Sequence, residues 1–293
     1  IPLGWGIFGW INRWIFIPVY VFLSQFMAHG IAIIVFTILV RLAMSPVTYK
    51  SYLSQAKMKV LRPEINELNE KFKKDPMKKQ QETMKLYGKA GVNPMAGCLP
   101  ALMQIPVFYA LFQFFPSAIE LRQKNFLWAE DLSSFDAVLS WKQHIPVISS
   151  FYGNHVSLFP ILAAIAIFFY MKMTTGDQQM SAPQQEGMPD MGKIMKIMIY
   201  ISPLMMMIFF NNNASGLSLY YFVSNTITIG IMLVIKNYII SDEKIHARIQ
   251  ENKTKDKPKS KFQQKMADMM EQAQEQQKQN KKAIEEKKAN RKR

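Results

Sequence analysis

The chain has 293 residues and a formal net charge of +15, and residues 50–89 and 241–293 together hold 27 of its 36 Lys+Arg and 14 of its 21 Asp+Glu. The other 200 residues carry only 9 basic and 7 acidic side chains, whereas a soluble domain of that size carries roughly 50 charges. This distribution excludes a single soluble globule and indicates a membrane protein with two charged appendages.

The residue types that enzymes and metal sites need are scarce. One cysteine, Cys98, and four scattered histidines exclude a disulfide framework and disfavour a structural zinc site. The sequence has no Gly-Lys-Ser/Thr phosphate loop and no pair of acids in an apolar stretch. We therefore expect no enzyme activity, no cofactor and no metal. The chain begins at Ile1 rather than Met, so we expect that a preceding segment has been removed.

The first apolar segment, 5–28, is rich in aromatic residues and carries a single charge, Arg13. Trp and Tyr prefer the headgroup region of a bilayer. We predict that 1–29 forms a helix lying on the outer membrane surface. The alternative is the start of a longer, tilted first span, although Pro18 disfavours one straight helix.

Five later stretches are long enough, or nearly so, to cross ~30 Å of hydrocarbon, and none shows the alternation of a strand. They lie at 30–47, 98–118, 156–173, 194–210 and 217–236. The predicted fold is all-α, a five-span bundle with two cytoplasmic appendages. We place the first span at 30–49, a helical hairpin at 50–93, the other four spans at 94–240 and a basic, partly disordered tail at 241–293.

The charge of the loops predicts the orientation in the cytoplasmic membrane. Segment 50–89 carries eleven Lys/Arg against five acids and the tail carries sixteen against nine, whereas 119–155 carries three against four. The positive-inside rule puts the hairpin and the C-terminal tail in the cytoplasm. Within the hairpin, Asp75-Pro76 predicts the start of a second helix and Gly91 its end. In the tail, residues Phe262 to Ala273 predict one amphipathic patch.

Arg41 lies inside the first span. Inserting an arginine at the centre of a membrane-spanning helix costs a free energy of ~2.5–3.5 kcal/mol. It shares a helix face with Thr37, Ser45 and Thr48, and a polar stripe inside a membrane faces protein or water. The alternative is an Arg that snorkels to the headgroups.

A second polar stripe runs along the fifth span, and Gln104 adds an amide in the second. The stripe consists of Ser218, Tyr221, Asn225 and Thr228. We predict a hydrated cavity between these faces. The alternative is hydrogen bonding that only holds the bundle together.

Methionine accounts for 21 residues and is concentrated around the fourth span. Flexible, polarisable Met side chains suit surfaces that accept many partners. We predict an adaptable apolar surface that includes Met198, Met205 and Met206, together with Phe108 of the second span. The alternative is ordinary lipid-facing packing.

Several short motifs, in this order and spacing, make the chain resemble the YidC family of membrane-protein insertases over about residues 1–240. They are Thr37-Ile38-Leu39-Val40-Arg41, Ser45-Pro46, Asn93-Pro94, Gly97-Cys98-Leu99-Pro100, Gln104-Ile105-Pro106, Glu120-Leu121-Arg122, Phe126-Leu127-Trp128, Asp131-Leu132-Ser133, Ser215-Gly216-Leu217-Ser218-Leu219-Tyr220-Tyr221 and Ser224-Asn225.

The resemblance implies a five-span core whose hydrophilic groove is open to the cytoplasm and to lipid and closed on the outside. Arg41 matches the groove arginine, and Thr37, Gln104 and Tyr221 match positions that line the groove or meet the client. The resemblance further implies the core of a Gram-negative member, without the N-terminal span and periplasmic domain that precede it there.

The function implied is ATP-independent insertion of client transmembrane segments. We expect client membrane proteins, the ribosome, the general secretion channel and anionic phospholipid as partners, and no DNA. The tail has a net charge of +7, which favours anionic lipid and ribosomal RNA; the alternative is a solvated tail that binds nothing specific. The rival functions are an anion channel or transporter and a purely structural assembly factor.

Overall fold

The computed structural model describes residues 7–73, 75–93, 99–143, 149, 152–175, 191–239 and 241–254. Most of the segment between the third and fourth predicted spans, and the predicted patch from Phe262 to Ala273, lie outside these residues. The chain forms two compact units, one of 1–55, 95–179 and 192–241 and the other of 56–94, 180–191 and 242–293. We call them the bundle unit and the hairpin unit and describe each by itself.

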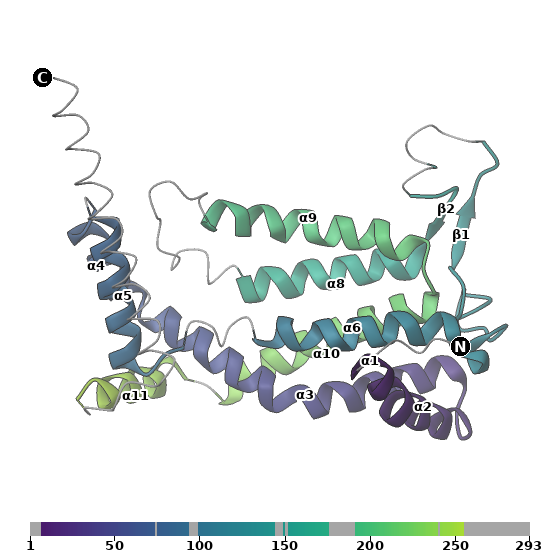
Figure 1. Ribbon diagram of the computed structural model, residues 1–293, viewed down its shortest axis with the longest axis horizontal. Helices are drawn as coiled ribbons and strands as arrows, with labels where there is room; N and C mark the ends of the chain where they lie inside the picture. Colours follow the sequence, from purple (N-terminus) through teal and green to yellow (C-terminus); the bar gives the residue numbers. More distant parts are fainter. Residues whose placement is uncertain are drawn as a thin grey trace, which may run out of the picture. The chain divides into compact units, whose positions relative to one another are not determined.

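The bundle unit is built from long apolar helices (Figure 1). They are α3 (His29–Val60, whose last five residues belong to the hairpin unit), α6 (Leu99–Ser117), α8 (Leu158–Thr175), α9 (Met191–Asn211) and α10 (Ser215–Val234), which continues into the π-helical turn η4 (Ile235–Ile239). α8 and α10 pack closely against each other. Within the described residues, two helices, His29–Val60 and Ser215–Ile239, are long and apolar enough to cross a membrane, and Leu158–Thr174 and Lys196–Asn211 are shorter apolar stretches. The count of five spans stays a prediction.

The N-terminal segment forms a separate helical element rather than the start of the first span. It consists of α1 (Ile7–Ile11), the π-helical turn η1 (Asn12–Phe16) and α2 (Ile17–Ser24), and a non-helical turn precedes α3. Pro18 lies near the start of α2, directly after the π-helical turn η1, so the helix changes type where the proline has no N–H to donate. Asn12 Nδ2 donates to the carbonyl of Ala110 at 2.8 Å, and Tyr20 contacts Phe114 edge to face. These contacts anchor the segment to α6; its position on the membrane surface stays a prediction.

Pro46 lies inside α3 without ending it. A proline has no N–H for the carbonyl four residues earlier, which here belongs to Leu42. The hydroxyl of Ser45 donates to that carbonyl at 2.8 Å. The Ser45-Pro46 pair is therefore compatible with a continuous helix.

The described residues are mostly helical, as predicted, but the loop between α6 and α8 contains a two-stranded antiparallel sheet that the all-α prediction did not include. It pairs β1 (Ala137–Ser140) with β2 (His155–Ser157), with a register shift between Ala137 and Leu139. All four residues of β1 are exposed. Strands of four and three residues, one without a buried face, carry no readable alternation of apolar and polar residues.

The loop that precedes β1 is hydrogen-bonded to the first residues of α10. Gly216 N donates to the carbonyl of Leu132 at 2.9 Å, and Ser215 Oγ donates to the carbonyl of Asp131 at 2.9 Å. Phe115 of α6 is fully buried beside Gly216. This end of the bundle unit is therefore tightly packed, and the Asp131-Leu132-Ser133 motif takes part in the packing.

The hairpin unit contains α4 (Arg62–Lys71), α5 (Pro76–Ala90) and α11 (Asp242–Thr254). Asp75 caps α5 by accepting from Lys78 N at 3.1 Å, and Gly91 ends the helix with a φ of 65°. Both features confirm the helix start and stop expected from the sequence. Burial raises the pKa of Tyr87 on α5, since its charged form would lose hydration.

α11 packs against α5 and gives the unit a third helix. Ile245 and Ile249 of α11 are buried, and Asn252 Nδ2 donates to the carbonyl of Ala90 at 3.4 Å. The first turns after the bundle are thus ordered helix, whereas the sequence indicated a charged tail with its amphipathic patch further on.

Candidate functional site

Arg41 lies in the middle of α3 and is half-buried. Its Nε donates to Ser224 Oγ of α10. Among the residues that the structure describes, the four remaining guanidinium N–H donors have no hydrogen-bond partner. The side chain is therefore turned toward α10 and keeps donors for water or a ligand.

Gln104 and Tyr221 form the second polar contact between helices. Gln104 Nε2 of α6 donates to the hydroxyl of Tyr221 on α10 at 3.3 Å. The ring of Tyr221 meets Phe108 of α6, with centroids 5.6 Å apart and planes at 62°. Tyr221 thus joins the polar site to the apolar surface that includes Phe108.

The other predicted polar residues bond within their own helices. Thr37 donates to the carbonyl of Ile33 at 2.7 Å, Thr228 to that of Ser224 at 2.8 Å, and Asn225 Nδ2 to that of Tyr221 at 2.7 Å. Such bonds to the preceding turn satisfy a polar group without linking two helices. These bonds within α10 do not support the alternative in which Asn225 and Thr228 hold neighbouring helices together.

Burial separates the predicted site residues into two groups. Thr37, Tyr221, Asn225 and Thr228 are 0%, 4%, 7% and 5% exposed, whereas Arg41, Ser45 and Gln104 are half-buried. Arg41 and Gln104 therefore offer polar atoms at the surface, and the buried residues lie behind them. The role of each in binding a client stays a proposal.

Ser224 is a site residue that the predicted polar stripe on the fifth span did not include. It is fully buried and is the partner of Arg41. The signal was present, because Ser224 lies three residues after Tyr221 and four before Thr228 on the same helix face. Tyr220 was also missed: its buried hydroxyl lies near Ser224 and Gln104 without a well-formed hydrogen bond in the described residues.

The predicted apolar surface is divided between exposed and packed side chains. Met198 and Met205 of α9 are 52% and 59% exposed. Met206 and Phe108 are only partly buried and pack against the core of the bundle unit. Within the described residues no group of three or more His, Cys, Asp or Glu side chains could hold a metal ion.

Comparison with known proteins shows which family the chain belongs to. A family model described as "60Kd inner membrane protein" matches residues 21–244. The "Membrane protein insertase YidC" of Parabacteroides distasonis is 47% identical over 269 residues, which are 91% of this chain and 41% of that relative. The chain belongs to the YidC family.

Two further comparisons, with a second YidC sequence and with a YidC crystal structure, give the same result. The "Membrane protein insertase YidC" of Porphyromonas gingivalis ATCC 33277 is 47% identical over 265 residues, which are 89% of this chain and 41% of that relative. A structure described as "Active YidC insertase crystal structure with the first transmembrane domain resolved" has a TM-score of 0.51 at 27% identity, covering 79% of this chain and 47% of that chain. The chain thus spans about two fifths of the length of the curated YidC relatives it matches.

Proposed function

We propose that this YidC chain inserts client transmembrane segments into the cytoplasmic membrane without ATP hydrolysis, with its C-terminus in the cytoplasm. The observation that carries the proposal is Arg41, a cation in the middle of an apolar helix that is oriented by Ser224 and retains unpaired donors among the described residues. An isolated arginine at this depth is costly. A water-accessible recess beside it would lower that cost and give the cation a role.

In this mechanism the hydrophilic flank of a client enters the recess beside Arg41 and Gln104. The guanidinium attracts acidic residues of the flank and disfavours basic ones. The apolar part of the client meanwhile moves along the exposed Met198 and Met205 into lipid, and its burial in hydrocarbon drives release. The packed start of α10, around Gly216, supports a recess that is closed at that end.

The hairpin unit and the tail would dock the ribosome, the general secretion channel and anionic phospholipid. Support comes from exposed lysines of the hairpin, among them Lys71 and Lys78, whose Nζ atoms lie 5.9 Å and 5.6 Å from the ring centroid of Phe72. Such cations attract phosphate groups on RNA or lipid with a strong dependence on salt.

The test replaces Arg41 with glutamate in a host depleted of its own insertase, supplied with the full-length protein. We expect insertion of a single-span client with an acidic flank to fall about tenfold or more, since attraction becomes repulsion, while a client with a neutral flank is affected less. Lys50→Glu, an exposed site on the same helix, is the matched control. Full activity of Arg41→Glu on acidic flanks would remove charge attraction from the mechanism.

The unpaired donors of Arg41 also suit an inorganic anion, so an anion channel or transporter is the second candidate. Purified protein in liposomes separates the two functions. Client insertion without ion flux supports the insertase, and selective anion uptake supports the channel or transporter.

A further inference from the structure

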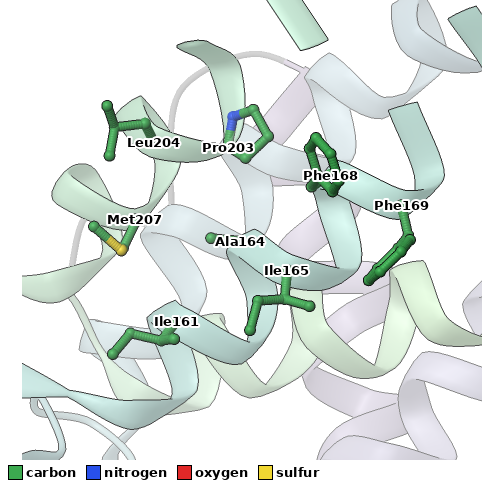
Figure 2. A pocket seen from close by; sticks show the side chains of 8 residues that line it. All are labelled: Ile161, Ala164, Ile165, Phe168, Phe169, Pro203, Leu204 and Met207. Atoms are coloured by element: carbon green, nitrogen blue, oxygen red, sulfur yellow. The ribbon is translucent and has the colours of Figure 1, made fainter. Parts of the chain in front are cut away.

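Exposed apolar side chains occur in two different settings in the bundle unit. The first is the long helices: α8 and α9 line an open groove of about 380 Å³ with side chains that include Ile165, Phe169 and Leu204 (Figure 2). Lipid tails are as apolar as these side chains, so contact with hydrocarbon accounts for the groove. The second setting is the loop after α6, where Leu127 is 71% exposed.

Leu127 is the first of the two central residues of a tight turn. Phe126 N donates to the carbonyl of Ala129 at 2.9 Å, and Ala129 N donates to the carbonyl of Phe126 at 3.0 Å. The turns that close such a short loop need a positive φ at the first central residue, which is usually Asn, Asp or Gly. Leu127 has a φ of 53°, and this backbone conformation is strained for a bulky apolar residue.

The residues on either side of Leu127 attach the turn to the protein. The Phe126 ring lies directly against Gly30 of α3, where a Cβ would overlap the ring. On the other side, Trp128 Nε1 donates to Asp136 Oδ2 at 2.8 Å. The exposure of Leu127 therefore results from a fixed turn rather than from a loose loop, and a strained backbone holds its apolar side chain outward.

The position of the turn indicates what covers Leu127. Gly30 is the second residue of α3, a helix that is long and apolar enough to cross a membrane. Other exposed apolar side chains flank the contact with Gly30: Phe26, in the turn before α3, is 71% exposed and Ile31 is 47% exposed. Such groups are unfavourable in water and favourable at the edge of the hydrocarbon.

Charged residues limit how deeply the loop can enter the membrane. Arg122 and Lys124 before the turn and Glu130 after it are exposed, and charged side chains stay in water or among the headgroups. Trp128, which is 39% exposed, is of a residue type that prefers the headgroup region. The loop thus has an apolar tip on a charged base, the pattern of a segment that lies in the membrane interface.

We propose that the turn at 126–129 is an interfacial anchor whose Leu127 side chain inserts into the acyl-chain edge of the leaflet that α3 enters at its first turn. The partner is the phospholipid bilayer, and no particular headgroup is required because the contact is apolar. The anchor does not depend on the insertase activity, since none of its residues belongs to the polar site at Arg41.

The first test measures the depth of Leu127 with a nitroxide spin label. The full-length protein, with Cys98 and any other cysteine replaced by serine, carries Leu127→Cys in vesicles of phosphatidylethanolamine and phosphatidylglycerol. We expect the label to collide mainly with oxygen, which concentrates in hydrocarbon, and several-fold less with an aqueous nickel chelate than a label at the control Glu130→Cys. Nickel access equal to that of the control would place the tip in water, and low access to both reagents would place it under protein; either result overturns the proposal.

The second test uses the sign of a stability change in nanodiscs of the same lipids. Asp and Asn tolerate a positive φ better than Leu, so in water Leu127→Asp would relieve strain and raise Tm. In hydrocarbon the cost of the charge exceeds this gain, and we expect Leu127→Asp to lower Tm by several degrees and Leu127→Asn to lower it less. The control Gln123→Asp, at an exposed residue of the same loop with a φ of 56°, leaves Tm unchanged or raises it. A Tm of Leu127→Asp equal to or above that of the wild type would overturn the proposal.

Discussion

Lys253 of α11 pairs with Glu64 of α4 at 2.5 Å, although 189 residues separate them in the sequence. The two side chains are 21% and 38% exposed, so the pair is partly screened and contributes at most ~1 kcal/mol. Burial of the Ile245 and Ile249 side chains contributes more of the free energy that holds α11 in place. The ion pair therefore determines where α11 docks more than it adds to the stability of the hairpin unit.

We expect Lys253→Glu to speed amide hydrogen exchange in α11 modestly, and Ile249→Asp to speed it strongly, because burial of a charge costs more than loss of a screened pair. The swap Lys253→Glu/Glu64→Lys restores protection close to the wild type. Gln250→Glu, which adds the same negative charge at an exposed position of α11, is the control. Exchange in the swapped variant as fast as in Lys253→Glu would contradict the pairing.

Ser224→Ala removes the hydrogen bond that orients Arg41, and bonds to charged groups contribute about 1.5–3 kcal/mol. We expect insertion of clients with acidic flanks to decrease several-fold, less than in Arg41→Glu. The measurement is the depletion-rescue assay with single-span clients.

Ser218→Ala is the matched control on the same helix. Both serines are fully buried, but Ser218 Oγ has no hydrogen-bond partner among the described residues. Its removal is expected to leave insertion unchanged and stability equal or higher. Equal losses in both variants would indicate a packing effect instead of orientation of Arg41.

Gly216→Ala is expected to destabilise the bundle unit by about 1–3 kcal/mol, as overpacking does. A Cβ there would lie 2.8 Å from Phe115 Cδ1 and 2.9 Å from the carbonyl oxygen of Leu132. Thermal unfolding in detergent measures the effect as a lowered Tm. Gly230→Ala, also in α10 but with nothing within 4 Å of its Cβ, leaves Tm unchanged or raises it; a fall as large as that of Gly216→Ala would contradict the packing account.

Asp136 caps the start of α8, and we expect Asp136→Ala to lower Tm by an amount equivalent to about 1–3 kcal/mol. Its Oδ2 accepts from Leu158 N and Phe159 N at 3.0 Å each and from Trp128 Nε1 at 2.8 Å. Asp136→Asn keeps a hydrogen-bond acceptor and lowers Tm less than Asp136→Ala. Glu130→Gln, an exposed site in the same loop, leaves Tm unchanged, and a similar fall there would point to the loop as a whole rather than the cap.

The elements with strong local signals were predictable. Asp75, Pro76 and Gly91 set the ends of α5 through hydrogen bonding and backbone angles that depend only on neighbouring residues. The apolar runs likewise predicted the long helices, and the order of the motifs predicted the family. Arg41 was identifiable because a cation is conspicuous in an apolar helix.

The contacts between distant segments were decided by the tertiary structure. The sequence showed two polar faces but not that Arg41 reaches Ser224 while Thr37, Asn225 and Thr228 bond to their own helices. A hydroxyl can donate to the turn before it or across to a neighbour, and helix packing determines which acceptor lies within reach. The docking of α11 and the small β1–β2 sheet depend in the same way on segments that only folding brings together.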